Sequence, residues 1–224
     1  MSSLATKEAY LELLPQFEKA SGHQVTTIWA GMVDILKRIK GGEATDVVIG
    51  SAVAVDELTR DGKLAAPRTD IATSGVAVAV RAGASRPDIS SGEAVKRALL
   101  KARSIGYSSG PSGVYLSKLF DKWGLAGELK PKLTQTPPGT AVGTLVARGE
   151  VELGFQQLSE LLPVAGIELV GPLPADIQTI TTFAGAPHVA AKEPAAARAL
   201  LAFLASPAAA QVMRKKGLQP ARAA

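Results

Sequence analysis

Three short segments, residues 2–6, 107–113 and 136–141, place serine, threonine or glycine directly before a predicted helix. The backbone N–H groups at a helix N-terminus are unpaired and lie at the positive end of the helix dipole, so they bind anions without a cationic side chain. The same residue types also serve as ordinary helix caps, which is the better explanation for any one segment alone. Because three segments share the pattern, anion binding is an equally good interpretation.

The polar and glycine positions of these segments are the candidate ligand contacts. Glycine is included because it lets a ligand approach the backbone closely. The candidates are Ser3, Thr6, Ser109, Ser112, Gly113, Gly139 and Thr140. Gln156 and Gln157 end a predicted strand, and two buried amides there would need hydrogen-bond partners, which a polar ligand could supply.

The sequence lacks the residues and motif spacings that several kinds of catalytic and cofactor site require. The chain has no cysteine and two histidines, so thiolate chemistry, disulfides and His-rich or Cys-rich metal sites are ruled out. The glycine loop lacks the Walker A and dinucleotide spacings, and Ser112 lacks the spacing of a hydrolase nucleophile. His188 lies in an apolar stretch and His23 in an exposed turn, so neither makes a nucleophile–base pair. We therefore predict no catalytic residue, no metal, no cofactor and no enzymatic activity. Asp46, expected to be the most buried carboxylate, is assigned to a hydrogen bond with a neighbouring loop.

The composition favours a globular protein of one or two domains. The chain has 224 residues, of which 46% are hydrophobic and 20% charged. Its apolar runs of about ten residues are shorter than the roughly 20 that cross a membrane, so no direct membrane insertion is expected. The net charge of +5 is spread along the chain without interleaved aromatic residues, which argues against nucleic-acid binding and weakly favours anions.

Predicted helices and strands alternate along the chain and are joined by short loops. This order is typical of an α/β protein with parallel sheets. Helices are expected at residues 6–20, 32–40, 53–61, 92–102, 114–123, 159–162, 194–204 and 207–216, with another that ends at 148. Strands are expected at residues 25–29, 46–50, 71–81, 104–107, 129–134 and 153–157, with further apolar segments at 167–169 and 177–183.

The start of the chain lacks a full first strand. The helical pattern begins at Thr6, whereas an α/β domain is expected to open with a buried strand. The first residues also carry neither the basic nor the apolar part of a secretion signal. We expect that the start is truncated and that upstream sequence supplies the strand and a signal peptide.

The order of several motifs resembles the molybdate-binding protein family of periplasmic solute-binding proteins, which serve ABC importers. The resemblance covers nearly the whole chain. The motifs that carry it are QFEKASG at residues 16–22, Arg38-Ile39, GEATDVVI at 42–49, Gly113-Val114-Tyr115, LVARGEVELGF at 145–155 and FLASPAAA at 203–210.

This resemblance implies a type II periplasmic binding protein with two Rossmann-like lobes and two crossover strands. Lobe one would be residues 1–79 plus 184–224, and lobe two residues 80–183, with the ligand enclosed between them. The implied partners are a small anionic ligand and the membrane permease of an ABC importer. The implied location is the periplasm.

The resemblance also carries ligand contacts onto individual positions. The two serines of the family's oxyanion pocket match Ala5 and the pair Gly31-Met32, so both hydroxyls are replaced here. An alanine backbone contact matches Ser112, a second loop contact matches Gly139 or Thr140, and a tyrosine matches Gln157. Because the pocket chemistry is changed, the ligand is either an oxyanion or a small organic carboxylate. The alternatives are an enzyme using the same cleft and an effector-sensing domain of a transcription regulator. A regulator would also need an N-terminal helix-turn-helix, for which this chain has no room.

Overall fold

The computed structural model describes residues 1–221 and divides into two compact units. Unit 1 is Met1–Ser74 with Thr181–Ala224, and unit 2 is Gly75–Ile180. Helices and strands alternate in both, so the predicted α/β class is confirmed. The expected parallel pairs are present in both units, and both also contain antiparallel pairs that the sequence did not predict. Mixed sheets of this kind are common in large α/β folds.

The sheet of unit 1 has a parallel part and an antiparallel part. Its strands are β1 (Ser2–Ser3), β2 (Trp29–Ala30), β3 (Val47–Ser51), β9 (Ile180–Pro187), the first half of β4 (Thr69–Arg81) and β10 (Gln219–Pro220). Strand β1 lies between β2 and β3 and is parallel to both. Strand β9 is antiparallel to β3, and β10 is antiparallel to β4.

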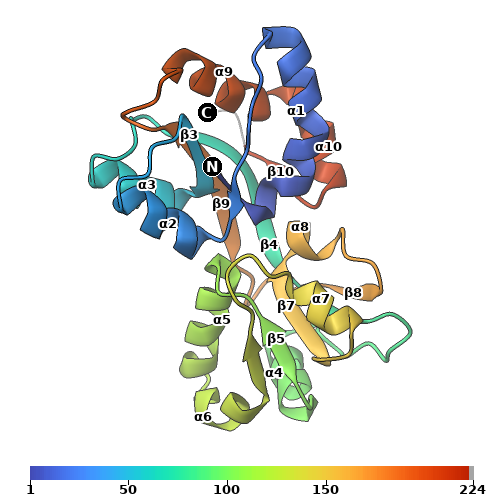
Figure 1. Cartoon of the computed structure of the whole chain (residues 1–224). Coiled ribbons are helices and arrows are strands. Elements are labelled where there is room, and N and C mark those ends of the chain that lie inside the picture. Colours follow the sequence, from blue (N-terminus) through green and yellow to red (C-terminus); the bar gives the residue numbers. More distant parts are fainter. Residues whose placement is uncertain (222–224) are drawn as a thin grey trace. The chain divides into compact units, whose positions relative to one another are not determined.

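Helices cover both faces of the unit 1 sheet (Figure 1). They are α1 (Lys7–Ser21), α2 (Met32–Lys40), α3 (Ala52–Arg60), α9 (Pro194–Leu204) and α10 (Ala210–Lys215), with 3-10 turns η1 (Leu4–Thr6) and η3 (Pro207–Ala209). Side chains along β3 point alternately to the two faces of the sheet. Val47 and Ile49 pack with α1, α9 and α10 on one face, and Val48 packs with α2 and α3 on the other. Among the described residues no single helix is long and apolar enough to cross a membrane, although the bent pair Pro194–Leu204 and Pro207–Lys215 passes by length and composition.

The sheet of unit 2 has three parallel strands with antiparallel neighbours. Its strands are the second half of β4, β5 (Ile105–Tyr107), β6 (Leu133–Gln135), β7 (Leu153–Gln157) and β8 (Ile167–Pro172). Strand β5 lies between β6 and β7 and is parallel to both, whereas β4 is antiparallel to β7 and β8.

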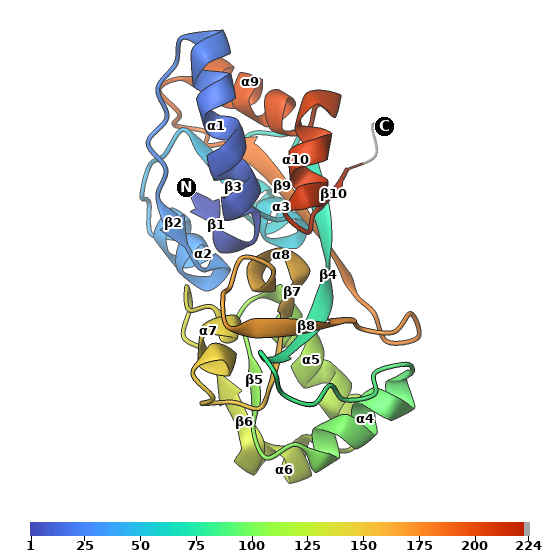
Figure 2. The same ribbon diagram turned by 90° about the vertical axis from the view of Figure 1, so that its right-hand side faces the viewer.

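Two groups of helices enclose the unit 2 sheet (Figure 2). The helices are α4 (Gly92–Lys101), α5 (Pro111–Lys122), α6 (Ala126–Leu129), α7 (Val142–Ala147) and α8 (Leu158–Leu161), with the 3-10 turn η2 (Lys130–Lys132). The valines of β4 face the core with α4 and α5, and its alanines Ala77 and Ala79 face Leu161 of α8. Small residues on that face let α8 approach the sheet closely.

Two predicted strands differ from the structure. Pairing in the expected strand 25–29 is confined to Trp29 and Ala30, because its neighbour β1 offers two residues to pair with. In the expected strand 129–134, residues 129–132 are helical and β6 starts at Leu133. Pro131 has no N–H to give to a sheet, which favours the 3-10 turn there.

Candidate functional site

The predicted ligand contacts of unit 1 lie at one edge of its sheet. Strands β1, β2 and β3 are parallel, so their carboxyl ends, at Ser3, Ala30 and Ser51, meet at the same edge. Ligands of open α/β sheets bind at this edge. The structure therefore brings Ser3, Ala5 and Thr6 together with the start of α2 at Gly31 and Met32.

In the segment of residues 2–6, the Ser3 hydroxyl is buried without a hydrogen-bond partner among the described residues. The residue is 6% exposed. Thr6 is also buried, but its Oγ1 lies 3.3 Å from Ser2 Oγ and donates a 3.3 Å hydrogen bond to the Ser3 carbonyl. An unpaired buried hydroxyl is unfavourable, so Ser3 is the better candidate for a ligand contact.

The other unit 1 candidates offer backbone groups. Gly31 caps α2 without a side-chain hydrogen bond, which leaves the first N–H groups of the helix available. The Met32 side chain packs on the backbone of Gly50, where an added Cβ would lie 2.4 Å from Met32 Sδ. Ala5 is buried in the core with α1. Both of these side chains are core residues, so their contribution to a ligand would come from the backbone.

Ser51 is a candidate that the sequence analysis missed. It ends β3, caps α3 without a side-chain hydrogen bond and is 7% exposed. Its signal in the sequence was available, since a serine follows a predicted buried strand and precedes a helix, as in the three segments chosen.

The predicted contacts of unit 2 also lie at one sheet edge. Because β5, β6 and β7 are parallel, the loops that follow them share that edge. Ser112 is 1% exposed and its Oγ lies 3.0 Å from Ser108 Oγ. A Cβ on Gly113 would lie 1.6 Å from the Ser108 carbonyl oxygen, so only glycine allows α5 to pack this closely on the loop after β5. Gly110 caps α5 without a side-chain hydrogen bond.

The remaining loop positions of unit 2 are less buried. Ser109 and Thr140 are half-buried, and Gly139 is exposed with a φ of 84°. The Thr140 N–H donates a 3.1 Å hydrogen bond to the Pro137 carbonyl, so it already has a partner. Thr136, which the sequence analysis did not select, is 2% exposed, and its Oγ1 has no partner among the described residues.

The end of β7 holds two buried amides, Gln156 and Gln157, which are 2% and 1% exposed. Gln156 Oε1 accepts a 2.8 Å hydrogen bond from the Val142 N–H, and its Nε2 donates a 2.9 Å hydrogen bond to Glu160 Oε1. Gln156 thus has the hydrogen-bond partners that a buried amide was expected to need, and the protein itself supplies them in place of a ligand. Gln157 stays a predicted contact.

Glu160 is a titratable group at this edge that the sequence analysis missed. Burial raises the pKa of its carboxyl to about 7, and the hydrogen bond from Gln156 opposes that rise. Next to it, Ser159 is 3% exposed and its Oγ has no partner within the described part of the chain. Both residues belong to the one-turn helix α8, and a short helix gives no pattern from which burial can be predicted.

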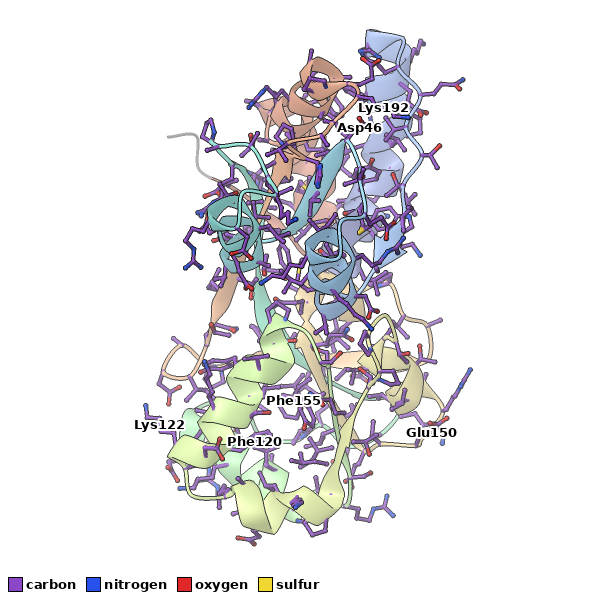
Figure 3. All side chains as sticks on the ribbon, turned by 60° about the vertical axis from the view of Figure 1, so that its left-hand side comes forward. Asp46, Phe120, Lys122, Glu150, Phe155 and Lys192 are labelled. Carbon is purple, nitrogen blue, oxygen red and sulfur yellow. The ribbon has the colours of Figure 1, made fainter. Side chains whose placement is uncertain are left out.

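The histidines and Asp46 lie away from both edges. His23 is exposed, as expected, and His188 is 7% exposed with Nδ1 accepting a hydrogen bond from the Ala190 N–H. Asp46 is exposed, so the expectation of burial is wrong, because it precedes β3 instead of lying within the sheet. Its predicted bond to a loop is confirmed, since Oδ1 accepts from the N–H groups of Lys192 and Glu193 (Figure 3). Within residues 1–221, no three His, Asp or Glu side chains group as metal ligands.

Comparison with known proteins assigns the family. The model of the bacterial extracellular solute-binding protein family matches residues 1–219, and the chain belongs to this family. It is 24% identical over 217 residues to the molybdate-binding protein ModA of Escherichia coli strain K12, covering 93% of this chain and 83% of that protein. The predicted kinship with the molybdate-binding proteins is confirmed.

The fold agrees with this assignment. The periplasmic molybdate-binding protein of Azotobacter vinelandii superposes with a TM-score of 0.79 at 19% identity, covering 97% of this chain and 96% of that one. The two-lobe α/β fold of periplasmic binding proteins, expected from the sequence motifs, is thereby confirmed.

A third relative contradicts one prediction. The chain is 43% identical over 216 residues to aconitate isomerase of a Pseudomonas species, covering 93% of this chain and 82% of that protein. That protein is named as an enzyme. The prediction that the chain has no enzymatic activity is therefore wrong, and the likeness points to an enzyme built on a solute-binding fold.

Proposed function

We propose that this member of the bacterial extracellular solute-binding protein family isomerises aconitate or a closely related unsaturated tricarboxylate. The observation that carries the proposal is the 43% identity to an aconitate isomerase, which extends over 93% of the chain. The altered contacts at Ala5, Gly31 and Gln157 also favour an organic acid over a compact oxyanion.

The chemistry of such a reaction sets what the site must contain. Aconitate has three carboxylates on a three-carbon chain with one double bond, and its cis and trans forms differ in geometry about that bond. Removal of a proton from the CH₂ group gives an anion delocalised over the three carbons and the carboxylates. Return of the proton to the other terminal carbon restores a double bond in either geometry. The protein must therefore carry a proton and stabilise negative charge.

The two sheet edges have the donors that a polycarboxylate needs. In unit 1, Ser3 offers a buried hydroxyl, and the start of α2 offers N–H groups. In unit 2, the hydroxyls of Thr136 and Ser159 are buried, and α5 begins without a side-chain cap. Fixed donors of this kind stabilise developing negative charge because they need no rearrangement during the reaction.

A second function is supported by the family itself. The match to the solute-binding family and the molybdate-binding relatives favour capture of a small anion outside the cytoplasm. In that case the chain delivers its ligand to the permease of an ABC importer, and its location is the periplasm.

Incubation of the purified protein with cis-aconitate tests the first proposal against the second. Proton NMR should detect trans-aconitate forming in proportion to protein concentration, with citrate and heat-denatured protein as controls. Isothermal titration with molybdate, tungstate, sulfate and tricarboxylates measures binding in parallel. Submicromolar molybdate binding without turnover of aconitate would overturn the isomerase proposal and favour transport.

A further inference from the structure

We propose that Glu160 is the catalytic residue that carries the proton in this reaction, and that Gln156 is the residue that positions its carboxyl group. This inference rests on the proposed isomerase function and adds the residues that would perform its central step.

The carboxyl of Glu160 is held by a chain of two hydrogen bonds. The Val142 N–H can only donate, so the atom of Gln156 that faces it, at 2.8 Å, must be the amide oxygen. The amide nitrogen is then directed at Glu160 Oε1, at 2.9 Å. The orientation of the carboxyl is thereby fixed by β7 and by the start of α7, which lie beside α8 in unit 2 (Figure 2).

Two buried hydroxyls lie, like Glu160, in segments that follow the parallel strands of unit 2. Ser159 precedes Glu160 in α8, which follows β7, and Thr136 directly follows β6. Both β6 and β7 are parallel to β5. Both hydroxyl oxygens are buried without a hydrogen-bond partner among residues 1–221. Two unpaired buried hydroxyls are independent signs of a polar ligand at this edge.

Within residues 1–221, the groups packed around α8 provide no cationic partner for Glu160. Strand β7 and helix α7 contain no titratable residue. In β8 the charged residue is Glu168, which is ion-paired with Arg86, and in the unit 2 part of β4 it is Arg81, which is exposed at the strand end. With burial as the dominant influence, the pKa of Glu160 is about 7. A carboxyl in this range can both accept and return a proton near neutral pH.

The step is balanced within the substrate and one carboxyl group. Glu160 takes a proton from the CH₂ carbon through its second oxygen, Oε2, because Oε1 accepts from Gln156. The electron pair of the broken C–H bond enters the delocalised anion. The same carboxyl then gives the proton to the other terminal carbon, a new C–H bond forms, and Glu160 is again a carboxylate. No oxidant, reductant or further reactant is needed.

The test measures turnover and binding in the full chain with Glu160→Gln. We expect kcat for cis-aconitate to fall at least about 100-fold, while binding of propane-1,2,3-tricarboxylate, the saturated analogue, changes less than threefold. Glu128→Gln, an exposed glutamate of α6 in the same unit, is the matched control and should retain wild-type kcat. Glu160→Asp keeps a carboxyl and guards against a folding defect in the first variant.

Gln156→Met tests the positioning role through the pH profile. Loss of the hydrogen bond removes a contact that favours the carboxylate, so the acid limb of the kcat profile should move to higher pH than in the wild type. Glu160→Gln with kcat within threefold of wild type, or an unmoved limb in Gln156→Met, would overturn the assignment while the isomerase proposal stands. A wild-type protein that does not isomerise aconitate would instead remove the proposed function, and the assignment with it.

Discussion

The two units follow the same plan but differ in the chemistry of the edges at which their parallel strands end. In unit 1, residues 2–6, 30–32 and 50–52 contain hydroxyls, glycine and apolar side chains but no titratable group. In unit 2, the corresponding edge adds the buried amide of Gln156 and the half-buried Glu160, whose carboxyl accepts a hydrogen bond from that amide. Both edges have hydroxyls and backbone N–H groups of the kind that bind anions, and we propose that the second also moves a proton. On this proposal, residues 156–160 supply the step that distinguishes an isomerase from a binding protein.

The largest expected effect on stability separates the close backbone contacts of the two units. Gly113→Ala in unit 2 would place Cβ 1.6 Å from a backbone oxygen, which cannot move away easily. Gly50→Ala in unit 1 would meet the flexible Met32 thioether at 2.4 Å. We expect Gly113→Ala to lower the free energy of unfolding by roughly 3 kcal/mol or more and Gly50→Ala by about 1–2 kcal/mol, as measured by urea denaturation.

Gly127→Ala is the control for this pair, because an added Cβ there meets no atom within 4 Å. It should leave the unfolding free energy unchanged or slightly raised. Equal losses for Gly113→Ala and Gly50→Ala would contradict the distinction between a rigid backbone contact at Gly113 and a flexible side-chain contact at Gly50.

Of the two edges, the one in unit 2 should show a pH-dependent effect on stability, because it contains Glu160. Its pKa in the folded state is about 7, above the ordinary 4.5, so the associated stability is full below pH 4.5 and is lost as the pH rises through 7. Glu160→Gln should therefore unfold like wild type at pH 4 and be more stable by up to roughly 3 kcal/mol at pH 8. Denaturant titrations at both pH values measure this, and a variant no more stable at pH 8 would argue against a buried carboxylate.

A smaller effect is expected for the hydroxyl of unit 1. Ser3→Ala removes a buried oxygen that we assign to ligand binding, so affinity for propane-1,2,3-tricarboxylate should fall roughly tenfold. Because Ser3 stabilises charge but the unit 1 edge has no proton carrier, kcat should fall by about tenfold at most, far less than in Glu160→Gln. Ser85→Ala, in an exposed loop of unit 2, is the control and should alter neither. A loss of kcat in Ser3→Ala as large as in Glu160→Gln would contradict the proposal that unit 1 binds the ligand while unit 2 carries the proton.

The smallest effect tests a feature that the two units share. Asp46 accepts from the N–H groups before α9, and Asp176 accepts a 2.9 Å hydrogen bond from the N–H of Gly92 at the start of α4. Each alanine variant should lower the unfolding free energy by about 1 kcal/mol and leave kcat unchanged. Thermal unfolding followed by circular dichroism checks both, and a change in kcat for either would be inconsistent with a purely structural role.

The sequence was sufficient for features set by local patterns. Residues 153–157 were predicted as a strand and form β7 with the same bounds, and the helix predicted at residues 32–40 is α2, with Gly41 as its C-cap. The serine and glycine segments predicted which loops would share a sheet edge, since parallel strands place their ends together. These features depend on neighbours in the chain.

The missed features depend on contacts between distant residues. A ligand was considered as the hydrogen-bond partner of Gln156, whereas the structure supplies Val142, a partner 14 positions earlier in the chain that no local pattern reveals. Glu160 was overlooked because its raised pKa follows from burial among β7, α7 and α8, which no pattern in a one-turn helix reveals. The sequence offers no nucleophile–histidine pair and therefore predicted no enzymatic activity, whereas a proton shift needs one well-placed carboxyl.

Deuterium exchange is the most direct test that unit 2 moves a proton. Wild-type protein and Glu160→Gln are each incubated with cis-aconitate in D₂O, and NMR follows deuterium entering the terminal carbons. We expect the wild type to form trans-aconitate and to exchange some protons with solvent, with both rates at least about 100-fold lower in Glu160→Gln. Isomerisation and exchange at equal rates in the two proteins would contradict the assignment of proton transfer to this carboxyl.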